Sequence, residues 1–149
     1  MKPFFIFDLD GTLALNKHRE HLAKAGQWDA FFKACDRDSP NAPVIEIFNR
    51  IAGDLDVEVE IWSGRSAAVL AKTLDWLIEH TAFDPQEHTI RMRPVGDHTP
   101  DEVLKKRWLD ELHPTHRDDL LAVFDDRDKV VKMWRDNGVA CFQVAPGDF

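Results

Sequence analysis

Near the N-terminus, residues 4–13 read FFIFDLDGTL. The four leading apolar residues predict a short buried strand, and Asp8 and Asp10 come at its carboxyl end. Because alternate residues of an extended chain share a face, both carboxylates can point into one small volume. Gly11 permits a sharp turn here, and Thr12 adds a hydroxyl group. The stretch fits a divalent-cation site, a covalent nucleophile or an acid–base pair, and on its own it also fits an ordinary Asp-rich turn.

Three further polar clusters accompany predicted elements later in the chain. In chain order they are Ser63-Gly64-Arg65 after a strand at 57–62, Lys105 on a helix at 100–112, and Asp125-Asp126-Arg127 after a strand at 120–124. Ligands of parallel α/β sheets bind at the carboxyl ends of the strands, so we expect these clusters to share one cleft with the first two aspartates. Taken singly, each cluster also fits a turn or a helix cap.

The rest of the chain alternates predicted strands and helices, which is typical of an α/β fold with a parallel sheet covered on both faces. Thr99 is expected to cap the helix at 100–112, with Pro100 at its first position. We expect one domain over residues 1–149, with three layers and a Rossmann-like sheet. Besides the elements above, the pattern predicts strands at 3–8, 88–93 and 139–144, and helices at 43–53, 66–80 and 128–137.

Residues 14–42 interrupt this alternation. The segment places Trp28, Phe31 and Phe32 among charged residues. It is interpreted as a small, mostly helical cap insertion over the end of the first strand. A long crossover that packs its aromatic residues into the core is the alternative. An insertion of about 30 residues is long enough for one wall of a cleft but too short for a full lid, by our estimate from typical loop lengths.

Composition narrows the class of protein. Apolar residues make up 44% of the chain and charged residues 31%, as expected for a globular domain. The apolar runs are far shorter than the roughly 20 residues needed to span a bilayer, so we expect no membrane association and a cytoplasmic location. Cys35 and Cys141 are too few for a disulfide framework. A net charge of −8 argues against extensive duplex binding, although it allows binding of a single phosphorylated end.

The four polar clusters, in this order, resemble the motifs of the haloacid-dehalogenase (HAD) phosphohydrolase superfamily. This resemblance implies that Asp8 attacks phosphorus and forms an aspartyl-phosphate. It implies that Asp10 protonates the leaving oxygen and then deprotonates water, and we expect neighbouring carboxylates to raise its proton affinity. Mg²⁺ would be held by the Asp8 side chain, the Asp10 backbone carbonyl, and Asp125 or Asp126. Lys105 would neutralise charge on the phosphoryl group, a choice over Lys106 that rests on alignment with the family.

The C-terminal part of the chain is similar to a narrower family, the phosphatase domain of bacteriophage-type polynucleotide kinase–phosphatases. The similarity covers residues 124–149, including the final Gly-Asp-Phe, and parts of the insertion. Arg93 lies twelve residues before Lys105, which matches the spacing of a catalytic arginine and lysine in that family. The implied activity is Mg²⁺-dependent removal of a 3′-phosphate from a DNA or RNA end. The phosphate-binding residues implied in this way are Thr12, Ser63, Gly64, Arg65, Arg93 and Arg127.

The sequence also departs from that family. It contains no GxxxxGK[ST] loop, so neither a kinase domain nor an ATP site is indicated, and a separate kinase or ligase is a candidate partner. An arginine of the family's insertion has no clear counterpart, with His18-Arg19 or Lys24 as weak options. The acidic charge favours an alternative in which the same chemistry acts on free nucleotides or other small phosphomonoesters. A non-catalytic binding module ranks last, because every expected acidic residue is present.

Overall fold

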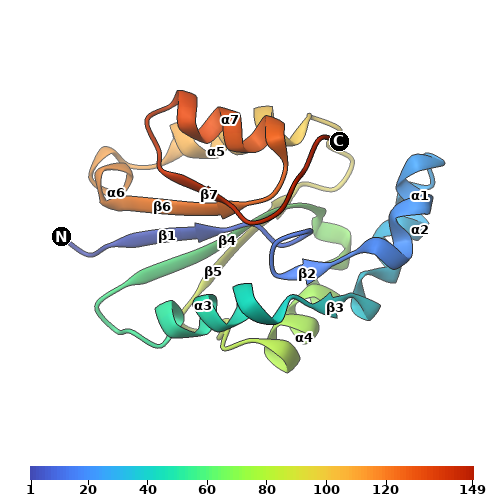
Figure 1. Cartoon of the computed structure of the whole chain (residues 1–149), viewed down its shortest axis with the longest axis horizontal. Coiled ribbons are helices and arrows are strands. Elements are labelled where there is room, and N and C mark those ends of the chain that lie inside the picture. The colour runs from blue at the N-terminus through green and yellow to red at the C-terminus, as the bar shows by residue number, and fades with distance from the viewer.

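The chain forms a five-stranded sheet in which every strand is parallel to its neighbours. The computed structural model describes residues 1–149 and orders the strands β5-β4-β1-β6-β7 (Figure 1). This confirms the predicted α/β class and the five predicted strands. The strands are β1 (Phe4–Phe7), β4 (Glu58–Ser66), β5 (Thr89–Arg93), β6 (Leu120–Asp125) and β7 (Cys141–Gln143).

Helices cover both faces of this sheet. In Figure 1, α5 (Asp101–Glu111) and α7 (Asp128–Asp136) lie on one face, and α3 (Ala42–Ala52) and α4 (Leu70–His80) lie on the other. A short helix that the sequence pattern did not predict, α6 (Pro114–Asp119), leads into β6. None of the helices combines the length and the apolar composition needed to cross a membrane.

The central strand β1 explains the two-sided core. Phe4 and Ile6 belong to the buried cluster under α5 and α7, whereas Phe7 belongs to the cluster under α3 and α4. This division follows from the two-residue period of a strand. A strand between two helical layers must be apolar on both faces, which is why the first motif begins with an unbroken apolar run. The core therefore fixes the point at which Asp8 leaves the sheet.

Two predicted helix starts differ from the structure. The helix predicted at 66–80 begins as a 3₁₀ turn, η3 (Ala67–Val69), and Ser66 caps it by accepting a hydrogen bond from the Ala68 N–H. The prediction that Thr99 caps α5 is wrong, because Pro100 occupies the cap position. The Thr99 carbonyl instead accepts a hydrogen bond from the Arg93 guanidinium, which holds the chain extended before the helix.

The insertion at 14–42 is mainly helical and stands beside the carboxyl ends of the strands (Figure 1). Its ends pair as a short antiparallel ribbon. Phe31 is buried but belongs to neither core cluster, and Trp28 is exposed, so the aromatic residues do not extend the core. Its elements are β2 (Ala14–Leu15), η1 (Lys17–Arg19), α1 (Glu20–Lys24), α2 (Trp28–Lys33), η2 (Ala34–Arg37) and β3 (Ser39–Pro40).

The C-terminal segment packs against the loop that follows β6. The Asp128 N–H donates to the Gly147 carbonyl at 2.7 Å. A Cβ atom at position 147 would lie 2.1 Å from the Asp126 backbone oxygen and 2.7 Å from the Arg127 Cα. Only glycine allows this approach between two backbones, so the last residues support the carboxylates of the β6 loop.

Gly147→Ala is expected to lower the free energy of unfolding by about 1–3 kcal/mol, because the methyl group must displace backbone rather than a flexible side chain. Chemical denaturation monitored by circular dichroism measures the change. Gly53→Ala is the matched control, since Gly53 has ordinary helical dihedral angles. Equal stability of Gly147→Ala and the parent protein would contradict the packing described for this segment.

Candidate active site

Three carboxylates and one ammonium group meet where β1 and β6 end. Oxygen atoms of Asp8, Asp125 and Asp126 lie within 4.8 Å of one another. The Lys105 ammonium donates to Asp8 Oδ1 at 2.8 Å and to Asp125 Oδ2 at 2.9 Å. All four residues are buried. Residues more than 90 positions apart therefore form one cluster, as the strand topology predicted. Lys106 points elsewhere and pairs with Asp110.

The charge of this acidic cluster is not balanced within the protein. One ammonium faces three carboxylates. Burial, followed by repulsion from Asp125, raises the pKa of Asp8 well above its ordinary value. The same two causes raise the pKa of Asp126 to about 6. Oxygen ligands carrying two uncompensated negative charges are what a hard divalent cation requires, so the donor set fits such an ion.

Gly11 and Thr12 shape the same cluster. Gly11 has φ +81°, and a Cβ atom there would lie 2.0 Å from Asp126 Oδ2. The turn after Asp10 therefore requires glycine both for its dihedral angle and for the space that the Asp126 carboxylate occupies. The Thr12 hydroxyl donates to Asp8 Oδ2 at 3.1 Å. Asp8 is thus held through both oxygen atoms, by Thr12 and by Lys105.

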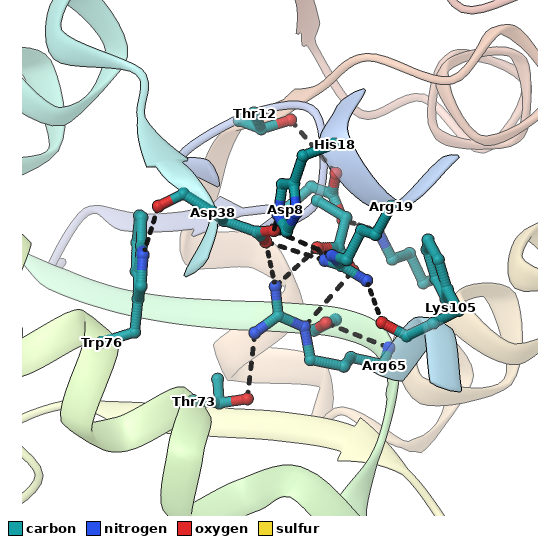
Figure 2. Close-up of polar contacts among 12 residues, drawn as sticks. Asp8, Thr12, His18, Arg19, Asp38, Arg65, Thr73, Trp76 and Lys105 are labelled. Carbon is teal, nitrogen blue, oxygen red and sulfur yellow. Dashed lines mark hydrogen bonds and ion pairs between the residues drawn. The ribbon is translucent and has the colours of Figure 1, made fainter. Parts of the chain in front are cut away.

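A second cluster alternates guanidinium and carboxylate groups. Asp10 Oδ1 accepts hydrogen bonds at 2.6 Å from both Arg19 and Arg65. Asp38 accepts from the same two arginines, at 2.8 Å from Arg19 Nη2 and 3.1 Å from Arg65 Nη2. Figure 2 shows Asp38 beside these two guanidinium groups and His18. Asp10 has 23% of its side chain exposed, whereas the other three side chains are fully buried.

Each arginine of this second cluster is also anchored outside it. Arg19 donates to the Phe31 carbonyl at 3.2 Å, and its guanidinium lies 4.2 Å from the centre of the Phe31 ring. Arg65 donates to the Thr73 hydroxyl of α4 at 3.0 Å, a contact drawn in Figure 2. The Trp76 indole N–H donates to the Asp38 carbonyl at 2.8 Å. The insertion and α4 are therefore joined through the buried ion pairs.

The expectation that neighbouring carboxylates raise the proton affinity of Asp10 is wrong. Burial does raise the pKa of Asp10, but the charges of Arg65 and Arg19 outweigh it and bring the pKa below its ordinary value. The carboxylates that were expected to repel it belong to the other cluster. The sequence analysis missed the effect of Arg19 because Arg19 belongs to the insertion, whose position the sequence did not reveal.

The strand predicted at 57–62 continues to Ser66, so Ser63, Gly64 and Arg65 form the last part of β4, next to these groups. Ser63 is fully buried, and its hydroxyl accepts a hydrogen bond from the Arg65 N–H at 3.1 Å. The Gly64 carbonyl accepts from Arg93 Nε at 2.8 Å. A Cβ atom on Gly64 would lie 2.4 Å from an Asp101 oxygen, so this position is limited to glycine by a neighbouring side chain. The Ser63-Gly64-Arg65 segment is therefore held by its own Ser63 hydroxyl, by Arg93 and by the nearby Asp101 side chain.

Arg93 and Arg127 are both bound to protein groups around Asp101. Arg93 Nη2 reaches Asp101 Oδ1 at 2.5 Å, and Arg127 Nη1 reaches Asp101 Oδ2 at 3.0 Å. Arg127 Nε also donates to the Phe149 carbonyl at 2.7 Å. Asp101 therefore links Arg93, the last residue of β5, to Arg127 in the loop that follows β6. In all of these contacts the two guanidinium groups bind Asp101 or backbone carbonyls, and not the carboxylates of the acidic cluster.

The structure thus brings together most of the residues that the sequence analysis proposed for the site, and it adds three further residues. Asp38 and Asp101 were not proposed as site residues, and Arg19 was only one of several weak options. Burial distinguishes Asp38 and Arg19 from ordinary surface charges, and ion pairs with Arg93 and Arg127 distinguish Asp101; a single sequence displays neither. Two hints were present: Asp38 lies in a part of the insertion that resembles the family, and Asp101 lies four residues before Lys105.

Comparisons with known proteins agree with this geometry. A family model for the polynucleotide kinase PNKP phosphatase domain matches residues 2–149. A protein of Autographa californica nuclear polyhedrosis virus, described as a bifunctional polynucleotide kinase/RNA ligase, is 32% identical over 129 residues, which cover 87% of this chain and 17% of that protein. A chain in the structure of the Pnkp1/Rnl/Hen1 RNA repair complex is 31% identical with a TM-score of 0.80, covering 99% of this chain and 44% of that one.

A more distant structure shares the fold alone. The class C acid phosphatase from Bacillus anthracis has a TM-score of 0.62 at 16% identity, covering 99% of this chain and 67% of that chain. This chain spans less than half the length of the viral protein and of the chain in the repair complex. The match over nearly every residue, together with the acidic cluster, establishes that the chain belongs to the family of polynucleotide kinase PNKP phosphatase domains and is a phosphoric monoester hydrolase.

Proposed function

We propose that this protein removes the 3′-phosphate from the end of a DNA or RNA strand, through an aspartyl-phosphate on Asp8 and with Mg²⁺ as cofactor. The observation that carries the proposal is the position of Asp8. Its carboxylate is held by Lys105 and Thr12 beside two further aspartates, and the paired arginines lie at the same edge of the sheet. A nucleophile, cationic groups and a cation-binding set are what phosphoryl transfer requires.

In the first half of the reaction, an Asp8 oxygen attacks phosphorus in line with the departing 3′-oxygen. The bond between phosphorus and the 3′-oxygen breaks, and that oxygen takes a proton from Asp10. Lys105 stabilises the charge on the phosphoryl group and fixes the orientation of Asp8. Ser63 and Gly64 place backbone and hydroxyl donors beside the phosphoryl oxygens.

In the second half, water attacks the phosphorus of the aspartyl-phosphate and gives its proton to Asp10. The acyl-phosphate bond breaks, which regenerates Asp8 and releases inorganic phosphate. The ionised form of Asp10 in the free site is the form that this water activation needs. For the first half, the phosphate must replace Asp10 as hydrogen-bond acceptor of Arg19 and Arg65, so that Asp10 can carry the proton.

Asp8, Asp125 and Asp126 would hold Mg²⁺, with the Asp10 backbone carbonyl as a further ligand. The bound ion would supply positive charge that lets the Asp8 carboxylate approach a phosphate dianion. We further propose that Arg93 and Arg127 act as positioning residues. Through Asp101 they hold the Gly64 segment and the Asp126 loop, and this assignment replaces the direct phosphate contact that the family resemblance implied for both.

The substrate and partners are inferred from the relatives. Their names refer to a polynucleotide kinase, an RNA ligase and an RNA repair complex, which supports nucleic-acid ends as substrates and a separate kinase or ligase as a partner. The net charge of −8 favours free nucleotides as the second candidate. Phosphate release from a 3′-phosphorylated oligonucleotide and from a mononucleoside 3′-phosphate, compared at equal concentration, separates the two. Higher kcat/KM for the mononucleotide would contradict the proposed function.

Asp8→Asn is expected to lower kcat by at least about 10⁴-fold, because an amide cannot form the acyl-phosphate. Single-turnover phosphate release measures the loss. The fold should persist, since the amide oxygen still accepts from Lys105 and the Thr12 hydroxyl can rotate to accept from the amide NH2. Asp118→Asn, at an exposed position of α6, serves as control. Turnover by Asp8→Asn at the parent rate would exclude Asp8 as the nucleophile.

Removal of divalent cations is expected to abolish activity and to weaken the fold only slightly. EDTA followed by dialysis gives the metal-free protein, and titration with Mg²⁺ should restore phosphate release. Isothermal titration calorimetry of Asp126→Asn should show weaker Mg²⁺ binding than the parent, because one of the three acidic ligands is lost. Full activity of the metal-free protein would contradict the cation role of the acidic cluster.

Arg19→Lys is expected to lower kcat/KM by about 10- to 100-fold, which corresponds to losing a charge-assisted hydrogen bond. Lysine keeps the charge but lacks the planar fork that reaches Asp10 and Asp38 together. Arg37→Lys is the matched control, because Arg37 is exposed on the same insertion. If both variants retain the parent kinetics, Arg19 has no part in the site.

A further inference from the structure

An open groove lies between the insertion and the start of α4. Its volume is about 330 Å³. Phe32 and Lys33 of α2 form one side, Val69 and Lys72 form the other, and Ser66 lies at the end of β4. A volume near 300 Å³ falls within the range of small-molecule sites. None of the catalytic roles assigned above uses this groove.

Two residues of the groove directly follow residues that belong to, or contact, the Arg19–Arg65 cluster. Ser66 directly follows Arg65, whose guanidinium contacts Asp10. On the other side, α2 is fixed to the second cluster, because the Phe31 carbonyl accepts a hydrogen bond from Arg19. Lys72 closes the far side by donating to the Lys33 carbonyl at 2.8 Å. Both walls of the groove are thus attached, through Phe31 and Arg65, to the cluster that contacts Asp10.

The lining combines aromatic surface with positive charge. Phe32 is half-buried, and Trp28 lies one helical turn earlier with its ring centre 6.3 Å from that of Phe32. Trp28 is 51% exposed, so its ring is available to a ligand. The lysines at 33 and 72 are exposed, and Lys33 forms no ion pair. Asp29 is the one acidic side chain in the lining.

Aromatic faces beside ammonium groups match a single-stranded nucleic acid. Bases stack on aromatic rings with little dependence on sequence, and lysines bind the intervening phosphates. A free sugar phosphate would leave the aromatic strip without a partner. The excess negative charge of the whole chain limits such contacts to a short stretch next to the site, which suits recognition of a strand end.

We propose that this groove binds the terminal nucleotides of the substrate strand, on the 5′ side of the 3′-phosphate that is removed. The base of the terminal nucleotide packs against Phe32, the next base reaches Trp28, and Lys33 and Lys72 bind the phosphate between them. The proposal rests on the proposed function and names the part of the substrate that the insertion recognises.

The test measures binding in the Asp8→Asn background, in which the substrate is not consumed. Fluorescence anisotropy gives the Kd of a labelled single-stranded oligonucleotide of about six nucleotides that carries a 3′-phosphate. Phe32→Ala is expected to raise this Kd about tenfold and Phe32→Tyr to leave it near the parent value, because tyrosine still stacks. Lys33→Gln is expected to raise Kd severalfold and to reduce its dependence on salt.

Phe142→Ala provides the aromatic control, since Phe142 is exposed on β7 and lies outside the groove. Circular dichroism checks that every variant is folded. If Phe32→Ala does not fold, Lys33→Gln decides the outcome. The proposal is overturned if no binding is measurable, or if the deciding variants bind within twofold of the parent. Phosphate release by the unmodified protein from the same oligonucleotide is measured in parallel, so failure of that reaction identifies failure of the proposed function itself.

Discussion

The contact of Lys105 with Asp8 and Asp125 is the interaction on which the site depends. The ammonium lies on α5, whereas the two carboxylates end neighbouring strands, so this one group ties a helical layer to the centre of the sheet. Lys105 lowers the pKa of Asp8, against the larger raising effects of burial and of the Asp125 charge. The interaction also leaves Asp126 with no cation of its own in the protein. Unpaired carboxylates in this cluster therefore destabilise the fold, whereas a cation needs the same carboxylate oxygens as ligands.

The insertion contributes a different kind of constraint. Asp38 is fully buried and contacts two guanidinium groups that also contact Asp10. Removing one partner of such a network leaves a buried charge without compensation, which costs far more than the network contributes to stability. The arrangement thus specifies a unique position for Arg19 relative to the first strand. In this way a short segment outside the sheet joins Arg65 of β4 in lowering the pKa of Asp10, which follows the central strand.

Sequence reasoning recovered the sheet and the acidic cluster because both follow from local rules. A buried strand must be apolar, and carboxylates at the ends of parallel strands must meet. It failed for Asp10, because the pKa of Asp10 is lowered by Arg65 and by Arg19, and Arg19 lies nine residues after Asp10 in a segment without a periodic pattern. It also did not reveal the contact of Arg93 with Asp101, because the spacing to Lys105 does not show which group the guanidinium binds.

The two clusters differ in charge, and this difference links the binding of the cation to that of the substrate. The Arg19–Arg65 cluster is balanced by Asp10 and Asp38, whereas the acidic cluster retains two negative charges after Lys105 is counted. A phosphate dianion that enters alone meets a negative region and must also displace carboxylates from both arginines. A divalent cation bound in the acidic cluster removes the first of these costs, which is the repulsion between the phosphate and the negative region. By thermodynamic reciprocity, bound phosphate must then strengthen cation binding by the same factor. Under the proposed function, the acidic cluster therefore binds its two ligands cooperatively.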